Sequence, residues 1–591
     1  MQKATNKQEA SSYEQVRLNQ ENQVQRTIYI SLLCVLVGII AGLGAVGFRY
    51  LIDFFYNLFF QGTLSFQGKM ASSTISRWGN LVFLVPAVGI ALANFITEKW
   101  APEAKGHGVP EVMAAVTENK GRIRPIVALV KVFASALTIG SGGSVGREGP
   151  IVQIGSGFGS TLGQMLKLSS RETIILVGAG AAGGISATFN APIGGVMFAL
   201  ELILPEYSIM TIMPLVISSV VATSLSSIFL GTSPAFIIPQ YAMVSAYELV
   251  FHVILGLLAG LLSVVFIKSV YGMEDFIEKI KIPSWAKAVS GGLLIGLIGL
   301  ISLKFFGAYY IYGVGYEFMD LVLSNKGFSL IMLLVLIVLK ILANTLTLGS
   351  GGSGGIFAPS LFLGAALGGA VGVVVNAIFP GGTGPVAAYA LVGMGAMVSG
   401  VTGGVLTSII MLFEMTRNYE IMMPLMLGAV ISHLVAKLLY PDTIYTRKLT
   451  RRGIPIQLDK RISSFKGISI GEIMKTEIVS CNPEDSVAKV LKIMHEHQLG
   501  LLPVIESDGR VLGTVSYKEL YKSKPEDSAR IGHLVYEHSI TIPQDSNLYD
   551  ALQVMQKGKI DVLVVQDGTK NLGVVTIKRI MYSFLAKQRH F

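Results

Sequence analysis

Hydrophobic and polar positions divide the chain into a long apolar part and a shorter amphipathic part. Apolar runs recur from Ile28 to Pro441, and several approach the ~20 residues that a helix needs to cross a bilayer. The clearest of these runs are 28–49, 81–100, 249–270 and 330–348. Two shorter runs, 151–166 and 356–367, start after Pro or Gly. We expect them to form helices that end partway through a membrane, where broken backbone is tolerated only if it lines a protein-walled or wet cavity.

A different pattern begins after about Ser463, where charged residues return. An amphipathic helix starting in NPEDSV at 482–487 is followed by two short strands in LPVIESDGRVLG at 502–513. The same order recurs with PQDSNL at 543–548 and VLVVQDGTKNLG at 562–573. Asp-Gly between alternating apolar residues is a hairpin signal. This part of the chain is therefore predicted to be a soluble α/β module built from two similar copies.

Composition supports a membrane protein. The 591 residues are 51% hydrophobic and 14% charged, whereas soluble chains average about 25% charged residues. The polar first 26 residues contain no signal-peptide core, so we expect the first apolar helix to be retained and the amino terminus to be cytoplasmic. The net charge of +10 is concentrated after the last apolar run. Its basic residues there are Arg447, Lys448, Arg451, Arg452, Lys460 and Arg461.

A juxtamembrane basic cluster indicates a cytoplasmic carboxy-terminal part and no nucleic-acid role. We therefore expect a multi-pass protein of the cell membrane, plasma or inner. The two cysteines, Cys34 and Cys481, and the scattered histidines have no metal-binding spacing. Nothing resembles a nucleophile–base pair. The chain is therefore not expected to be an enzyme or to require a metal or another cofactor.

One sequence is used twice. GSGGSVGREGP at 140–150 returns as GSGGSGGIFAP at 349–359. Between 131–146 and 340–355, ten of sixteen positions are identical at an offset of 209, including Lys131 and Lys340. A repeat of this size in a membrane protein indicates two pseudo-symmetric halves with the binding site at their junction. A weaker sequence similarity between the two halves precedes Glu201 and Glu414. We expect these two glutamates to be structural carboxylates at helix ends.

Four elements together resemble the CLC family of chloride channels and proton-coupled chloride transporters. They are GHGVP at 106–110, GREGP at 146–150, GIFAP at 355–359 and Tyr445 in DTIYTRKL. The two carboxy-terminal copies resemble cystathionine-β-synthase (CBS) domains. The resemblance implies a homodimer with an all-α polytopic membrane domain of two inverted repeats with broken helices, joined to a cytoplasmic α/β CBS pair.

The expected boundaries follow from these resemblances. They are an amino-terminal segment 1–27, a membrane domain 28–446 with halves 28–240 and 245–446, a linker 447–462, and CBS domains 463–525 and 526–591.

The CLC resemblance implies an anion site made by backbone amides at helix starts, where N–H groups and the helix dipole favour negative charge. The implied residues are His107, Gly108, Gly146, Arg147, Glu148, Gly149, Gly355, Ile356, Phe357, Ala358 and Tyr445. A carboxylate inside a membrane is costly and points to function. Glu148 mimics the anion when ionised and frees the path when protonated, so it is expected to be both gate and proton acceptor.

Two departures from the family pattern bear on function. His107 stands where chloride-selective relatives usually have serine, which leaves the choice among chloride, nitrate, bromide and fluoride open. Leu202 stands where proton-coupled members commonly keep an inner glutamate. An aliphatic residue cannot relay a proton, which favours a passive chloride channel gated by Glu148.

The alternative is chloride or other anion/proton antiport with water replacing the inner carboxylate. A remote alternative is a nucleotide-sensing membrane protein or a CBS-bearing cation transporter. A cation transporter predicts acidic residues within the spans, whereas this chain supplies glycine amides and Arg147.

The CBS resemblance implies an adenine nucleotide, either ATP, AMP or a cyclic dinucleotide. In that family a Ser or Thr and an acidic residue three positions later hold a ribose. The first copy keeps Ser516 and Glu519, whereas the second has Thr576 followed by Arg579 in place of the acid. We expect at most the first cleft to bind a nucleotide, and a folded pair without ligand is the alternative.

Overall fold

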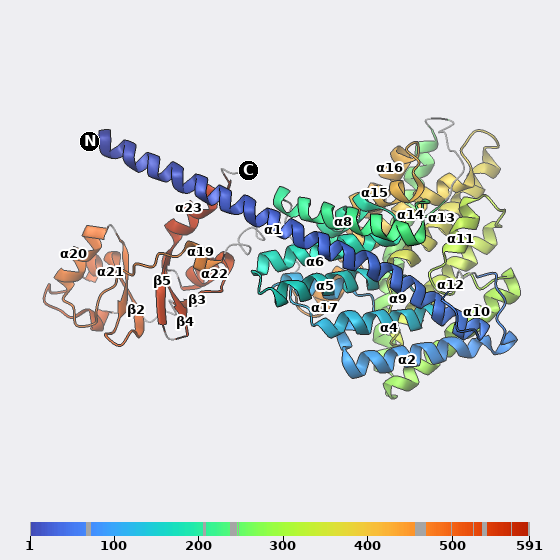
Figure 1. Ribbon diagram of the computed structural model, residues 1–591, viewed down its shortest axis with the longest axis horizontal. Helices are drawn as coiled ribbons and strands as arrows, with labels where there is room; N and C mark the ends of the chain where they lie inside the picture. The colour runs from blue at the N-terminus through green and yellow to red at the C-terminus, as the bar shows by residue number, and fades with distance from the viewer. Residues whose placement is uncertain are drawn as a thin grey trace. The chain divides into compact units, whose positions relative to one another are not determined.

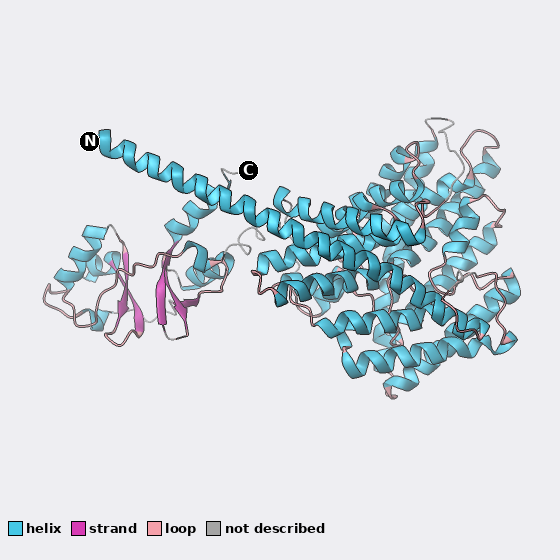
Figure 2. Cartoon of the chain, in the orientation of Figure 1, coloured by secondary structure: helices cyan, strands magenta, loops and turns pink. Residues whose placement is uncertain are grey.

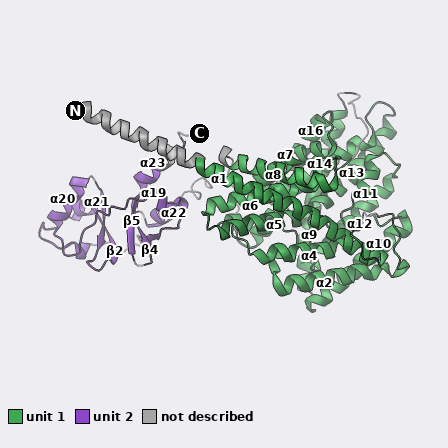
Figure 3. Cartoon of the chain, in the orientation of Figure 1, with its two compact units in different colours: residues 1–456 green, residues 457–591 purple. Residues whose placement is uncertain are grey.

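The computed structural model describes residues 2–66, 72–204, 208–236, 245, 247–454, 469–497, 499–523, 525–534, 541–558, 560–568 and 570–588. Of residues 2–24, 209–210 and 583–588 it describes the backbone alone. The chain forms two compact units, Met1–Ile456 and Gln457–Phe591, shown in green and purple in Figure 3. The border between the units lies inside the predicted linker 447–462.

The regular elements of the first unit are helices joined by loops, and its described residues contain no strand, as Figure 2 shows. Its first half contains α1 (Gln2–Tyr56), α2 (Val85–Trp100), α3 (Val109–Thr117), α4 (Pro125–Gly140), α5 (Glu148–Met165), α6 (Ser170–Phe189), α7 (Pro192–Phe198) and α8 (Ile209–Leu230). Its second half contains α9 (Glu248–Lys279), α10 (Ser284–Phe306), α11 (Tyr316–Leu323), α12 (Leu330–Gly349), α13 (Phe357–Ile378), α14 (Val386–Thr402), α15 (Val405–Thr416), α16 (Met422–Leu439) and α17 (Thr446–Arg451). Figure 1 shows these helices crossing one another at many angles.

Nine helices in the described part of the chain are long and apolar enough to cross a membrane. One departs from expectation. The run 356–367 was predicted to be a short helix, but α13 continues to Ile378 and is itself such a candidate. The glycines at 368, 369 and 372 are not breakers here, because glycine inside a membrane helix permits close packing against a neighbouring helix. A Cβ on Gly368 would come within 2.0 Å of the carbonyl oxygen of Tyr389 on α14.

Glycine contacts also bring α5 and α6 together. A Cβ on Gly155 would come within 2.1 Å of the Gly180 carbonyl oxygen, and a Cβ on Gly180 within 2.0 Å of that of Gly155. In the second half, Gly364 and Gly393 make the same reciprocal approach at 2.3 Å between α13 and α14. Each half thus contains a pair of helices whose backbones touch, as small residues at helix interfaces allow.

The two glycine–serine loops bind each other directly. Gly146 N donates to Gly355 O at 2.7 Å, and Gly355 N donates to Gly146 O at 2.6 Å. The matched threonine of each repeat also accepts a hydrogen bond from a serine N–H of the other half. Ser353 N donates to Thr138 Oγ1 and Ser144 N to Thr347 Oγ1, both at 3.1 Å. The repeat therefore joins the two halves at their centre.

The second unit holds the strands (Figure 2). Its helices are α19 (Ile470–Ile473), α20 (Val487–His497), α21 (Tyr517–Ser523), α22 (Leu548–Gly558) and α23 (Ile577–Gln588), and its strands are β1 (Leu501–Ile505), β2 (Val511–Ser516), β3 (Thr541–Pro543), β4 (Val562–Asp567) and β5 (Lys570–Thr576). Strands β1 and β2 form an antiparallel hairpin, and β4 pairs antiparallel with β5 and parallel with β3. The predicted α/β class is confirmed, and each copy contains the expected amphipathic helix, α20 or α22, followed by a hairpin.

Candidate functional site

The motif loops of both halves meet where helices begin. Gly108 precedes α3, Arg147 precedes α5, and Ile356 precedes α13. A Cβ on Gly149 would lie 2.1 Å from the carbonyl oxygen of His107 and 3.0 Å from the Cα of Gly355. The three loops therefore touch through backbone atoms at positions where only glycine fits. Gly108 also has a φ of +85°, which favours glycine.

Glu148 is buried at the first turn of α5, with 1% of its surface exposed. Its Oε1 accepts a hydrogen bond of 2.7 Å from the hydroxyl of Tyr316, the first residue of α11. Its Oε2 folds back over Gly146, where a Cβ would come within 2.1 Å of it. The carboxylate thus lies against the loop whose amides start the helix, as an anion at a helix amino terminus does.

Several polar atoms around these loops are buried and lack a hydrogen-bond partner among the described residues. They are His107 Nδ1, Arg147 Nε and Gln153 Oε1. Most buried polar atoms in proteins are satisfied, so a group of unsatisfied ones indicates a place for water or a ligand. Within the same described part of the chain, no three His, Cys, Asp or Glu side chains are placed to hold a metal ion.

The other predicted anion-site residues are buried too. Ile356 and Phe357 are 1% exposed and Ala358 is fully buried. The Phe357 ring packs against those of Phe189 and Phe198, with centroids 5.7 and 6.5 Å away. These side chains fill space while the backbone of α13 begins.

Tyr445, at the start of α17, is 2% exposed. Beside it, Ile444 O accepts a hydrogen bond of 2.6 Å from the Tyr271 hydroxyl. The ring of His107 stands edge-on to that of Tyr271 at 6.1 Å. Tyr271 of α9 therefore contacts both His107 and the segment that carries Tyr445.

The two repeated lysines are fully buried and bind carbonyl groups. Lys131 Nζ donates to Ala104 O at 2.9 Å and to Gly106 O at 2.6 Å, just before α3. Lys340 Nζ donates to Ile311 O and Gly313 O, both at 3.2 Å, just before α11. Each lysine thus holds the loop that leads into a short helix of its own half.

Glu201 and Glu414 each accept hydrogen bonds at the start of the helix that adjoins or contains the other glutamate. Glu201, after α7, accepts the backbone N–H of Thr407 at 2.7 Å at the start of α15. Glu414, near the end of α15, accepts the N–H of Gly194 at 2.6 Å at the start of α7. Both carboxylates therefore bind backbone N–H groups at the start of a helix. Leu202 packs toward Gly404, whose added Cβ would lie 3.3 Å from Leu202 Cδ1.

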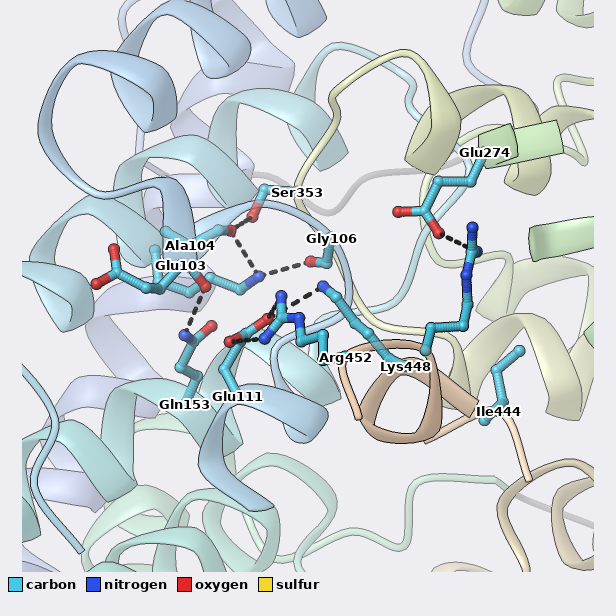
Figure 4. A network of polar contacts seen from close by, with 12 residues as sticks. Glu103, Ala104, Gly106, Glu111, Gln153, Glu274, Ser353, Ile444, Lys448 and Arg452 are labelled. Carbon is cyan, nitrogen blue, oxygen red and sulfur yellow. Dashed lines mark hydrogen bonds and ion pairs between the residues drawn. The ribbon is translucent and has the colours of Figure 1, made fainter. Parts of the chain in front are cut away.

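A group of ionic contacts fastens α17 to α3 and α9 (Figure 4). Glu111 of α3 accepts hydrogen bonds of 2.8 and 2.7 Å from Arg452 and pairs with Lys448 Nζ at 3.1 Å. On the α9 side, Arg451 pairs with Glu274 at 3.5 Å. Burial raises the pKa of Glu111, but the hydrogen bonds from Arg452 and Lys448 outweigh it and hold that pKa below its ordinary value.

Tyr316 was missed by the reasoning from sequence. GVGYE at 313–317 corresponds to GHGVP at 106–110 at an offset of 207, and its second glycine, Gly315, has a φ of +86° against +85° for Gly108. The two glycines, spaced as in the first motif, were a usable signal. The proline and the histidine of the first motif are not repeated, which hid the correspondence.

Comparison with known proteins settles the family. The family model described as "Voltage gated chloride channel" matches residues 89–437, more than half of the chain. The chain belongs to the CLC family. Two matches to the CBS domain, at 470–526 and 531–586, identify the second unit as a CBS pair. This CLC protein is therefore a multi-pass membrane transport protein and not an enzyme.

Relatives of this CLC protein carry two kinds of name. The H(+)/Cl(−) exchange transporter ClcA of Yersinia pseudotuberculosis is 30% identical over 73% of this chain and 89% of its own length. A protein of Ralstonia nicotianae named as a ClcB-like chloride channel protein is 32% identical over 65% of this chain and 89% of its own.

Solved structures agree on the fold. A slow cyanobacterial Cl−/H+ antiporter is similar with a TM-score of 0.63 and 25% identity, covering 72% of this chain and 97% of that one. A eukaryotic CLC transporter, 18% identical, covers 94% of this chain and 98% of its own with a TM-score of 0.61. Its coverage extends beyond the membrane unit.

Proposed function

We propose that this protein exchanges chloride for protons across a membrane, as a homodimer with one pathway in each subunit. The observation that carries the proposal is the buried carboxylate of Glu148 lying over the paired loops of the two halves. A carboxylate in that position competes with a bound anion for the same amides when ionised and carries a proton when neutral. The ClcA relatives and the cyanobacterial structure, whose names specify exchange, support this function.

The sequence favoured a passive channel because of Leu202, and that function remains the second candidate. In an exchanger with this sequence, protons reach Glu148 from the inner side through water, since Leu202 has no group to accept them and Glu201 and Glu414 are occupied as helix caps. A channel needs no such route. The relative from Ralstonia nicotianae, whose name specifies a channel, supports this second candidate.

One measurement separates exchanger from channel. The purified protein is reconstituted in liposomes with a chloride gradient, and proton movement is recorded together with chloride efflux. We expect sustained proton uptake against its own gradient, driven by chloride. Chloride efflux without uphill proton movement would establish the channel instead. If the protein moved no small anion, both functions would be rejected.

His107 is proposed to tune anion selectivity. Its Nδ1 has no hydrogen-bond partner among the described residues and its ring is 3% exposed. We expect His107→Ser to raise the preference for chloride over nitrate by about fivefold, because one neutral hydrogen bond from a compact hydroxyl is worth about 1 kcal/mol. Anion competition in the liposome assay measures this. An unchanged selectivity series would mean that the imidazole does not face the anion path.

We further propose that the CBS pair binds an adenine nucleotide. Ser516 ends β2 and Glu519 lies in the first turn of α21. In the second copy, Arg579 Nε instead donates to the carbonyl oxygen of Ile473, the last residue of α19, at 3.0 Å. Only the first copy therefore keeps a carboxylate for the ribose hydroxyls.

Titration calorimetry of the full-length protein tests the nucleotide proposal with ATP, AMP and a cyclic dinucleotide. We expect Glu519→Ala to weaken binding at least about tenfold, since a hydrogen bond to a charged group is worth about 1.5–3 kcal/mol. Arg579→Ala serves as the control and should bind as the wild type does. Equal binding by the Glu519 variant, or no binding of any of the three nucleotides, would leave the pair as a structural module.

A further inference from the structure

A cavity of about 530 Å³ opens beside Glu148 in the membrane unit. Its walls include Arg49 and Asp53 of α1, Arg147, Tyr316, Glu317 and Asp320. Glu148 itself is not among the lining residues. The cavity is therefore polar enough to hold water, and a layer of lining residues, Arg147 and Tyr316 among them, adjoins the gate carboxylate.

Two residues of that layer adjoin Glu148. Arg147 precedes it in the chain and lies over the Tyr316 ring, with its guanidinium carbon 5.0 Å from the ring centroid. Tyr316 donates its hydroxyl proton to Glu148 Oε1 at 2.7 Å. Arginine is a donor without acceptor capacity and stays protonated, whereas a phenol hydroxyl both donates and accepts. Of the two, only Tyr316 can pass a proton onward.

We propose that protons enter and leave Glu148 on the cavity side through the hydroxyl of Tyr316. In the inward step, hydronium in the cavity gives a proton to the phenol oxygen and becomes water, while the phenol O–H gives its own proton to Glu148 Oε1. The phenol stays neutral and the carboxylate becomes a neutral acid. The release of a proton reverses the same two transfers. This inference rests on the proposed exchange function and names the proton-transfer residue for it.

The fixed hydrogen bond also positions the carboxylate. While Glu148 is ionised, Tyr316 holds it in its observed orientation and stabilises its charge. The ionisable groups that face this pair come from several elements. They are Arg49, Asp53, Arg147, Glu317, Asp320, Lys340 and Tyr445. A variant that changes only the hydroxyl leaves all of these in place.

Tyr316→Phe is that variant. In liposomes we expect chloride flux to remain within about threefold of the wild-type value while coupled proton flux falls at least about tenfold, as general acid–base groups contribute 10²–10⁴ to proton-transfer rates. Because the ionised carboxylate also loses a charge-assisted hydrogen bond, the external pH of half-maximal chloride flux should rise by about one unit. Tyr312→Phe is the matched control, since that cavity-lining hydroxyl binds Gly296 O at 3.0 Å instead.

The outcomes are distinct. Loss of proton flux with chloride flux retained, in Tyr316→Phe and not in Tyr312→Phe, supports the proposal. A shift of the pH midpoint with wild-type proton flux would show that the hydroxyl only positions Glu148 and would overturn proton transfer through it. If the wild type itself moves no protons, the exchange function fails first, and the pH midpoint of chloride flux alone then reports on the hydrogen bond.

A second pair of variants covers the case in which the Phe protein does not fold. Tyr316→His places a group that can accept and release protons, whereas Tyr316→Leu has none. We expect the His variant to carry several times more protons per chloride than the Leu variant. Equal ratios in the two would overturn the proposal.

Discussion

Glu148→Ala is expected to leave chloride flux in place while removing at least about 99% of coupled proton flux, because a positioned proton-transfer group contributes 10²-fold or more. The carboxylate is the buried acid at the junction of the two halves, bonded to Tyr316 and lying over Gly146. Without it, nothing at this position competes with chloride for the helix amides or carries the proton. Chloride flux should therefore lose its dependence on external pH.

The comparison with Glu148→Gln sharpens that result. Glutamine keeps the volume and a hydrogen-bonding oxygen but cannot be ionised, so it imitates the protonated gate at every pH. Both variants should lose coupling. Glu103→Gln, a change at an exposed carboxylate paired with Arg124, is the control and should behave as wild type. Proton flux that persists in well-folded Glu148→Gln protein would contradict the assigned role.

Gly149→Ala is expected to abolish transport by changing one methyl group. The new Cβ would lie 2.1 Å from the His107 carbonyl oxygen, closer than any carbon–oxygen contact in a folded protein. Neither neighbour can easily move away, because His107 is packed against Tyr271 and Gly355 is hydrogen-bonded to Gly146. Overpacking of this kind costs about 1–3 kcal/mol or more, and here it separates the loops that form the site.

The matched control is Gly272→Ala in α9, where an added Cβ meets nothing within 4 Å. Alanine in an open helix interior is favoured over glycine by about 0.5–1 kcal/mol, so this variant should be as stable as wild type or more so. Thermal unfolding and chloride efflux are measured on both. Normal efflux by Gly149→Ala would show that the three loops are not held as closely as the structure has them.

The fold was largely predictable because its signals are local or repeated. Apolar runs located the helices, Asp508–Gly509 marked the β1–β2 hairpin, and the repeat indicated two halves. The length of α13 was not predictable in this way, since glycine ends helices in water but packs them in membranes. The direct pairing of Gly146 with Gly355 also has no sequence signal of its own, because a repeat shows that two loops are alike and not that they touch.

The candidate site was likewise predictable only in part. The residues at helix starts were nameable from motifs, which are contiguous in sequence. The contacts of Lys131 and Lys340 with loop carbonyls, and that of Tyr316 with Glu148, are side-chain contacts between elements far apart in the chain. Such contacts depend on the packing of whole helices, which no short motif encodes.

The ionic contacts around α17 have a mechanical consequence. The six-residue helix after Tyr445 is tied to α3 through Lys448 and Arg452, and to α9 through Arg451. Tension arriving from the chain beyond residue 452 meets these anchors before it reaches Tyr445. We expect a displacement of α17 to require that the pairs of Glu111 with Lys448 and Arg452 break first. Motion of the chain beyond residue 452 is therefore expected to reach Tyr445 only when these ion pairs open.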